Sequence, residues 1–167
     1  MINAIFAADQ YGGIGFQGSL PWPNISNDLK NFKRLTEGHV VVMGRKTYDD
    51  PKLPKPLVGR TVYVASKRLI ADSVYQISGD IASEVLKIEQ AHPDKIIWVV
   101  GGSEIIEQCQ DLYDNIYLTH VKGSYKIDVK VNLKGLLSGK LMRYASAAPE
   151  DNCTFVRYES IFRRPKA

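Results

Sequence analysis

The chain has 167 residues and a mass of 18.7 kDa, which is enough for one domain with a full hydrophobic core. Its hydrophobic fraction of 44% and charged fraction of 24% are typical of a soluble globular protein, and no apolar run approaches the roughly 18 residues that a membrane span needs. The formal net charge of +4 favours anionic ligands, but the charges are scattered and form no basic block with interleaved aromatic residues. Nucleic-acid binding and membrane association are therefore not expected.

The ends of the chain and its two cysteines indicate a cytoplasmic protein. The first residues lack the basic region and the cleavage site of a signal peptide. Cys109 and Cys153 form no CxxC motif and have no histidine close by in sequence, so we expect reduced thiols and no metal site. Within a single domain over 1–167, we expect residues 163–167 to form a solvated, frayed tail.

The first predicted elements are a buried strand and a glycine-rich loop. Residues 2–8 are a short apolar run, which is typical of a buried strand. Residues 9–18 contain four glycines around Ile14 and Phe16. Such a loop either moves as a lid whose apolar side chains close a cleft, or is an ordinary surface connection. The loop by itself does not decide between the two.

The segment 20–36 organises the rest of the chain. Pro21 and Pro23 cannot continue a helix or a central strand, so Trp22 is held in a stiff, extended segment. The side chains that follow are suited to capping a helix, and they predict one over 27–36. The candidate caps are Asn24, Ser26 and Asn27.

Asp28 heads an otherwise apolar face of this predicted helix, because Phe32 and Leu35 lie four and seven residues further on. An acid in the first turn can simply complement the helix dipole. Alternatively, it lies at the bottom of an apolar cleft and accepts hydrogen bonds from a ligand, since a buried ionised acid needs a donor. Both interpretations stay open at this point.

Three predicted strands end in residues suited to phosphate. Parallel strands place their carboxyl ends at one edge of a sheet, where ligands of open α/β proteins bind. Glycines, cations and helix N-termini at these ends predict one long polyanionic ligand. The motif after the first of these strands is not a Walker A loop, and the motif after the last is not a GxGxxG fingerprint. The strands cover 39–43, 61–65 and 95–100, and the motifs that follow them are Gly44-Arg45-Lys46-Thr47, Ser66-Lys67-Arg68 and Gly101-Gly102-Ser103.

The remaining pattern predicts an α/β fold. A short strand over 74–77, a helix over 80–90, a helix from 103 to 110 and a strand over 116–121 follow the alternating order of parallel sheets. The signal over 123–139 is poor, and 141–147 with 153–162 predict a closing hairpin. We therefore expect a mostly parallel central sheet with an antiparallel C-terminal hairpin and helices on both faces.

Over 1–162 the sequence resembles the dihydrofolate reductase family. The motifs that carry the resemblance follow in the family's order and at its approximate spacing. They are Ile14-Gly15, Leu20-Pro21-Trp22, Asp28-Leu29, Phe32-Lys33, Val42-Met43-Gly44-Arg45-Lys46-Thr47, Gly59-Arg60, Val100-Gly101-Gly102 and Tyr117-Leu118-Thr119-His120.

The resemblance implies reduction of 7,8-dihydrofolate to 5,6,7,8-tetrahydrofolate by NADPH, in one-carbon metabolism. Hydride would pass from nicotinamide C4 to pterin C6, and Asp28 would promote protonation of N5 through water. A cytoplasmic monomer whose only partners are dihydrofolate and NADPH is the family's usual form. The same resemblance implies a cis peptide at Gly101-Gly102 and gives Asp128 the role of steadying a closed lid.

The implied site residues fall into three groups. The catalytic group, in which Thr119 partners the acid and Trp22 holds ordered water, is Asp28, Trp22 and Thr119. Substrate contacts are implied for Ile5, Ala7, Asp28, Leu29, Phe32, Leu57, Arg60, Val100 and Thr119, with Arg60 pairing with the glutamate α-carboxylate. Cofactor contacts are implied for Ala7, Ile14, Gly15, Leu20, Gly44, Arg45, Lys46, Thr47, Ser66, Lys67, Arg68, Val100, Gly101, Gly102, Ser103 and Ile106. In this last group Arg45 and Ser66 would meet the 2′-phosphate.

Some positions depart from the family's pattern. Ile106 stands where many members have a tyrosine near the nicotinamide, and Glu104 stands where some have a cation near the phosphates. Residues 129–131 replace an aromatic-proline motif, and extra residues around 51–55 reshape the rim. Two rivals follow: a same-fold reductase of riboflavin synthesis that acts on a phosphoribosylamino-pyrimidine, and a nonenzymatic nucleotide-binding protein.

Overall fold

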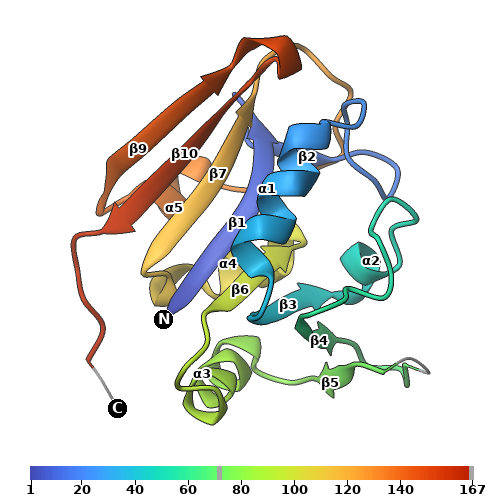
Figure 1. The fold of residues 1–167 in the computed structure, drawn as a ribbon, viewed down its shortest axis with the longest axis vertical. Helices are drawn as coiled ribbons and strands as arrows, with labels where there is room; N and C mark the ends of the chain where they lie inside the picture. Colours follow the sequence, from blue (N-terminus) through green and yellow to red (C-terminus); the bar gives the residue numbers. More distant parts are fainter. Residues whose placement is uncertain (71–72, 166–167) are drawn as a thin grey trace.

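An eight-stranded sheet runs through the computed structural model, which describes residues 1–70 and 73–165 (Figure 1). Its strand order is β5-β4-β3-β6-β1-β7-β10-β9. The pairs from β5 to β7 are parallel, whereas β10 is antiparallel to both β7 and β9. The strands are β1 (Ile2–Asp9), β3 (Val40–Gly44), β4 (Thr61–Ala65), β5 (Tyr75–Ile77), β6 (Ile97–Gly101), β7 (Asn115–Val121), β9 (Lys140–Ala148) and β10 (Cys153–Ser160). The predicted mostly parallel sheet with an antiparallel hairpin is confirmed.

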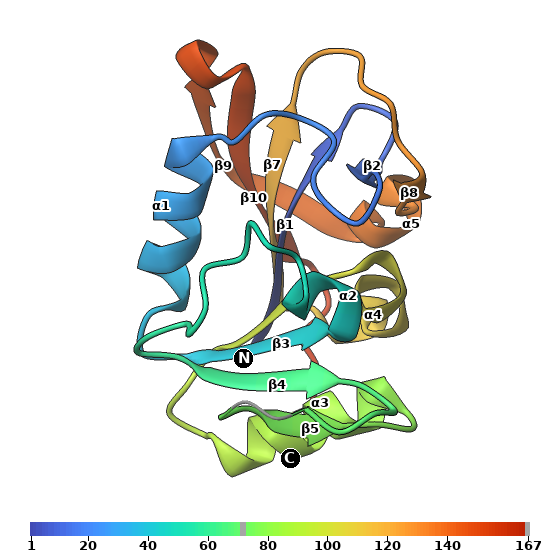
Figure 2. The ribbon, with the colours of Figure 1, turned by 90° about the vertical axis from the view of Figure 1, so that its right-hand side faces the viewer.

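Helices cover both faces of this sheet, as Figure 2 shows with α1 on one side and α4 and α5 on the other. They are α1 (Ser26–Thr36), α2 (Arg45–Tyr48), α3 (Ile81–Ala91), α4 (Ser103–Gln108) and α5 (Leu133–Leu137), with 3₁₀ turns η1 (Gln110–Leu112) and η2 (Pro149–Asp151). No helix in these described stretches is long and apolar enough to cross a membrane.

The two faces follow from the alternation of side chains along β3. Val40 and Val42 pack into the core cluster that includes the buried side of α3 and α4. Val41 and Met43 point the other way, into a cluster that Phe32 of α1 packs against. Because successive strand residues face opposite sides, a fully apolar run serves both layers at once.

A two-stranded sheet holds the glycine-rich loop. Strand β2 (Gly13–Gly15) pairs in antiparallel fashion with β8 (Val129–Lys130). The sequence predicted only loop over these residues, because strands of two or three residues are too short to show a period.

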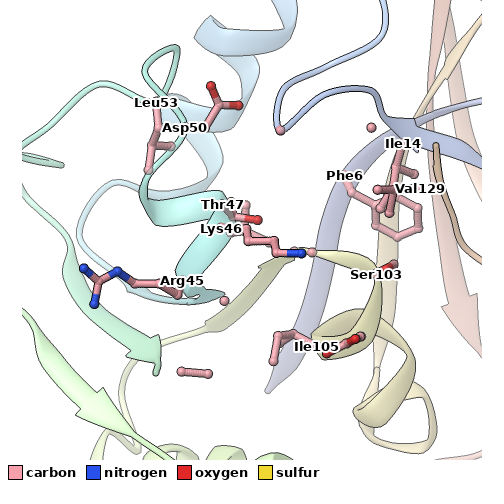
Figure 3. A pocket seen from close by; sticks show the side chains of 18 of the residues that line it. Phe6, Ile14, Arg45, Lys46, Thr47, Asp50, Leu53, Ser103, Ile105 and Val129 are labelled. Carbon is pink, nitrogen blue, oxygen red and sulfur yellow. The ribbon is translucent and has the colours of Figure 1, made fainter. Parts of the chain in front are cut away.

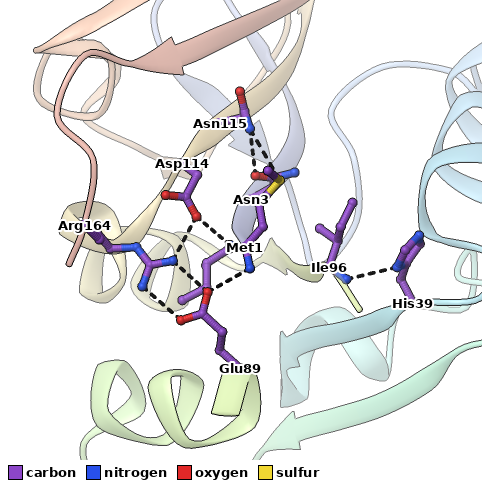
Figure 4. A network of polar contacts seen from close by, with 9 residues as sticks. Met1, Asn3, His39, Glu89, Ile96, Asp114, Asn115 and Arg164 are labelled. Carbon is purple, nitrogen blue, oxygen red and sulfur yellow. Dashed lines mark hydrogen bonds and ion pairs between the residues drawn. The ribbon is translucent and has the colours of Figure 1, made fainter. Parts of the chain in front are cut away.

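The expectation of a solvated, frayed tail is wrong at Arg164. Its guanidinium donates to both Glu89 carboxylate oxygens at 3.0 and 2.8 Å and to Asp114 Oδ2 at 2.8 Å (Figure 4). The Asp114 carboxylate also accepts the backbone N–H of Ile2 at 2.8 Å. The C-terminal segment is therefore tied to α3 and to the start of the central strands, while 166–167 lie outside the described residues.

Candidate active site

A cleft of about 710 Å³ opens at the carboxyl ends of β3, β4 and β6 and along the middle of β1 (Figure 3). This is the sheet edge at which the sequence placed the phosphate motifs. The predicted site residues that line it are Ile5, Ala7, Ile14, Gly15, Leu20, Asp28, Leu29, Phe32, Gly44, Arg45, Lys46, Thr47, Ser66, Lys67, Arg68, Val100, Gly101, Gly102 and Ser103. Residues from six separate stretches of the chain thus meet in one cavity.

The acid lies at the apolar end of this cleft. Asp28 is in the first turn of α1, and its Oδ1 accepts a hydrogen bond of 2.7 Å from the Thr119 hydroxyl of β7. Burial raises the pKa of the Asp28 carboxyl above its ordinary value of 3.8, and the Thr119 bond opposes part of that rise. Asp28 is therefore more than a residue that complements the helix dipole, because it is a partly desolvated acid with one dedicated donor.

Trp22 and Thr119 stand behind the acid rather than on the cleft wall. Trp22 is 2% exposed, and its Nε1 atom is buried without a hydrogen-bond partner among the described residues. Thr119 is buried in β7 directly beside Ala7 of β1. Neither side chain is among the residues that line the cleft.

Arg60 and Leu57 lie outside the lining of the cleft. Leu57 is buried in the core cluster that Phe32 packs against. The guanidinium of Arg60 lies 5.9 Å from the centre of the Phe32 ring, donates to the Val58 carbonyl at 3.1 Å and approaches the Thr36 hydroxyl at 3.4 Å. Arg60 is therefore held at the end of the cleft that Phe32 forms.

The opposite end of the cleft is cationic. Arg45 donates from Nη1 to Ser66 Oγ at 3.3 Å, while its Nε pairs with Asp49 at 3.0 Å. The Ser66 hydroxyl also accepts the backbone N–H of Arg68 at 3.1 Å. Strand ends β3 and β4 therefore present a hydroxyl and a guanidinium side by side, and Lys46 extends from α2 toward the Ser103 side in Figure 3.

Glycines bring two strand ends close together at this cationic end. The Gly101-Gly102 peptide is cis, as the family resemblance implies. A Cβ added to Gly44 would lie 3.2 Å from Ile105 Cγ1 and 3.6 Å from the Gly102 nitrogen. A side chain there would fill the gap between the first turns of α2 and α4, so the glycines keep backbone N–H groups open to a ligand.

The glycine-rich loop is tied down beside the cleft. The backbone N–H of Gln17 donates to Asp128 Oδ2 at 2.9 Å, and the Asp128 N–H donates to the Gly15 carbonyl at 2.9 Å. Ser19 lies near the Asp50 carboxylate, with oxygen–oxygen distances of 3.3 and 3.4 Å. The described loop thus spans from β8 to the segment after α2 and covers one wall of the cavity.

Ile106, one of the implied cofactor contacts, lies behind the cleft wall. Its side chain is fully buried in the core, and its carbonyl accepts the Tyr113 hydroxyl at 2.7 Å. The neighbouring Ile105 lines the cleft instead. Ile105 and Ile106 are adjacent apolar residues of the six-residue helix α4, so the sequence pattern alone does not show which of the two faces the cleft.

Several lining residues were missed by sequence reasoning. They include Phe6, Asp50, Leu53, Gln108 and Val129. Phe6 and Val129 flank Ile14 in Figure 3, where they form the wall opposite α2. Phe6 could have been predicted, since Ile5 and Ala7 of the same strand were predicted. In a strand that is apolar on both faces, however, the sequence does not show which side chains face the cavity.

The comparisons with known proteins agree with this geometry. The family model described as "Dihydrofolate reductase" matches residues 1–154. The chain belongs to the dihydrofolate reductase family. It is 38% identical over 138 residues to dihydrofolate reductase type 8 of Escherichia coli, covering 79% of this chain and 80% of the relative. It is 33% identical over 164 residues to the type 9 protein of Escherichia coli, covering 93% and 89%.

The solved structures show the same fold. A dihydrofolate reductase from Enterococcus faecalis, complexed with NADP(H) and RAB-propyl, matches with a TM-score of 0.78 at 24% identity, covering 97% of each chain. Membership of the dihydrofolate reductase family makes the chain an NADPH-dependent oxidoreductase that reduces dihydrofolate. The cationic end fits such a cofactor, because its donors and glycine cradle suit phosphate groups.

Proposed function

We propose that the chain binds the pterin of 7,8-dihydrofolate on Asp28 and promotes its protonation at N5 to give 5,6,7,8-tetrahydrofolate. The observation that carries this proposal is the half-buried Asp28 carboxylate bonded to Thr119 at the apolar end of the cleft. Bound NADPH would supply the hydride from nicotinamide C4 to pterin C6. The residues of the chain bind, orient and exclude water around that transfer.

Asp28 has the oxygens needed to orient a pterin. Thr119 uses one lone pair of Oδ1 and leaves the other acceptor sites free. The pterin 2-amino group and its neighbouring ring nitrogen match these sites, so the acid would fix the ring and favour its protonated form. The proton would reach N5 through water held near Trp22, whose buried Nε1 has no acceptor among the described residues.

The apolar wall and Arg60 would bind the rest of the substrate. Leu29 and Phe32 line the cleft beyond Asp28 and suit the aminobenzoyl ring, with Leu57 packed behind them. Arg60, stacked on Phe32, presents a planar fork that suits the glutamate α-carboxylate. Ile5 and Val100 would line the pterin and nicotinamide slots through their carbonyls.

The cationic end would hold the cofactor by its phosphates. Arg45 and Ser66 already lie within hydrogen-bond distance of each other, so both can donate to one 2′-phosphate. Lys46, Thr47 and Gly102 would serve the pyrophosphate at the first turns of α2 and α4. Glu104 also lines the cleft here, which would reduce the attraction for phosphate. A cytoplasmic, single-domain monomer is part of the same proposal.

Isotope transfer tests the proposal directly. NADPH deuterated at nicotinamide C4 should deliver deuterium to C6 of tetrahydrofolate, with one product formed for each NADPH consumed, as mass spectrometry of the product would show. Binding of NADPH without any reduction of dihydrofolate would overturn the proposal and favour a nonenzymatic nucleotide-binding protein.

A further inference from the structure

The helix that carries the acid has no local cap. The N-cap of α1 is Ile25, whose side chain makes no capping hydrogen bond, so the predicted caps Asn24, Ser26 and Asn27 do not act as such. Asn27 is instead bonded to Asp151, 124 residues away, with its Nδ2 donating to the carboxylate at 2.5 Å. A distant acid therefore holds the first turn of α1, which carries Asp28.

Apolar packing joins the same two regions. A separate core cluster contains Trp22 and Ile25 from the entry to α1, and Ala148 and Cys153 from the two sides of the hairpin turn. The turn itself is η2, which includes Asp151 and ends at Asn152 in the left-handed conformation with φ 57°. The Asn27–Asp151 bond therefore forms beside packed side chains, on a turn of fixed shape.

Two adjacent helix residues are bonded to neighbouring parts of the central sheet. Asp28 is bonded to Thr119 of β7, and Asn27 is bonded to Asp151 of η2, the turn that joins β9 to β10. Strands β7 and β10 pair directly, with Phe155 opposite Thr119. The two bonds thus fix both the position and the rotation of the first turn of α1 on this sheet, which a single bond could not do.

Electrostatics places the two acids in the same neighbourhood. The buried Cys153 thiol lies close enough that the charges of Asp28, Asp151 and Glu150 all help to raise its pKa, after burial itself. Glu150 is an exposed acid in the same turn. It therefore provides a matched control for Asp151, with the same charge one residue away.

We infer that Asp151 is a positioning residue, which holds α1 through Asn27 so that the Asp28 carboxylate meets both Thr119 and the pterin. The inference rests on the proposed function and adds a residue outside the cleft to its machinery. Loss of the bond would let the first turn of α1 open. The backbone N–H groups of Asp28 and Leu29, both bonded to the Ile25 carbonyl at 3.0 and 3.3 Å, would then exchange faster with solvent.

Two readouts on Asp151→Ala test this inference. Amide hydrogen exchange without ligands should rise in the first turn of α1, and kcat/KM for dihydrofolate should fall about tenfold while KM for NADPH stays unchanged. Asp151→Asn keeps an acceptor oxygen for Asn27 and should restore most of the activity. Glu150→Ala should leave exchange and kinetics within about twofold of wild type. It removes one negative charge from the same turn but keeps the bond between Asp151 and Asn27.

The outcomes separate cleanly. Exchange in α1 that is unchanged in Asp151→Ala would overturn the inference, as would kinetics equal to those of Glu150→Ala. If Asp151→Ala fails to fold, Asn27→Ala removes the same bond from the helix side, and wild-type kinetics in that variant would overturn the inference. Hydrogen exchange is measured without ligands. If exchange is unchanged in Asp151→Ala while the wild-type protein reduces dihydrofolate normally, the inference is overturned and the proposed function stays intact.

Discussion

Thr119 donates its hydroxyl hydrogen to Asp28 over 2.7 Å, and this bond joins strand β7 to the helix that lines the cleft. Burial raises the pKa of the Asp28 carboxyl, while the hydroxyl stabilises its ionised form and lowers that pKa in part. The pKa of Asp28 thus depends on two opposing effects, burial and the hydrogen bond from Thr119. Removal of either one should shift this pKa.

Replacing Thr119 by Val should therefore raise the pKa of Asp28 further. The variant loses the donor that favours the carboxylate and keeps the burial that disfavours it. Because the folded-state pKa lies above the unfolded value, the variant's free energy of unfolding should fall relative to wild type as pH rises from about 4 toward neutrality. Carbon-13 NMR titration of the Asp28 carboxyl measures the shift. Thr119→Ser keeps the donor, and an equal rise in that variant would contradict the explanation.

Removal of Arg45 should distinguish the two nicotinamide cofactors. Its guanidinium lies 3.3 Å from the Ser66 hydroxyl, where both can reach a 2′-phosphate that NADH lacks. Arg45→Ala should weaken NADPH binding by about 2 kcal/mol, or about thirtyfold, since a charge-assisted hydrogen bond contributes about that much. NADH binding, measured by fluorescence titration, should change less than about threefold. Equal losses for both cofactors would remove the 2′-phosphate assignment.

Arg60→Ala should raise the KM for dihydrofolate about tenfold or more, because it removes the guanidinium that we propose pairs with the glutamate α-carboxylate. The value of kcat should stay nearly the same, since Arg60 lies on Phe32 at the rim, away from Asp28. Dihydropteroate, which lacks the glutamate, is the matched control and should be reduced equally well by variant and wild type. An unaltered KM for dihydrofolate would place the carboxylate elsewhere.

The ion-pair network at the C-terminal end should support stability in a pH-dependent way. The Arg164 guanidinium and, to a lesser extent, the N-terminal ammonium of Met1 lower the pKa of Glu89 to about 2, so the network contributes fully above the ordinary value of 4.5 and is lost as pH falls toward 2. Arg164→Gln should cost about 1–2 kcal/mol at pH 7, between the values for exposed and buried pairs. Thermal unfolding at pH 7 and pH 3 measures it, with the exposed Arg163→Gln as control. If Arg164→Gln lowered the free energy of unfolding by the same amount at pH 7 and at pH 3, the role of Glu89 would be contradicted.

Local pattern predicted the central strands and the edge of the sheet at which the cleft opens. Apolar runs bounded by glycine predicted the central strands, and parallel topology then required Gly44, Ser66 and Gly101 to meet at one edge. For Asp28 the sequence left two interpretations open. The choice between them depended on burial and on the Thr119 hydroxyl, 91 residues away, which no local pattern contains.

Contacts between distant residues account for what was missed. Asn27 reads as a helix cap in sequence, yet its side chain is bonded to Asp151. Arg164 reads as part of a free tail, yet Glu89 and Asp114 converge on it. Charged and polar side chains carry no periodic signal that names their partners, so only the folded chain reveals these pairs.

The most direct test of the account is the decrease in NADPH absorbance on addition of dihydrofolate, measured for wild type and Asp28→Asn. The wild-type protein should consume NADPH, whereas the variant should fold, bind NADPH normally and lose at least about a hundredfold in turnover at pH 7, the scale expected for a residue that promotes proton transfer. Turnover within twofold of wild type in Asp28→Asn would contradict the assignment of Asp28 as the acid that serves the pterin.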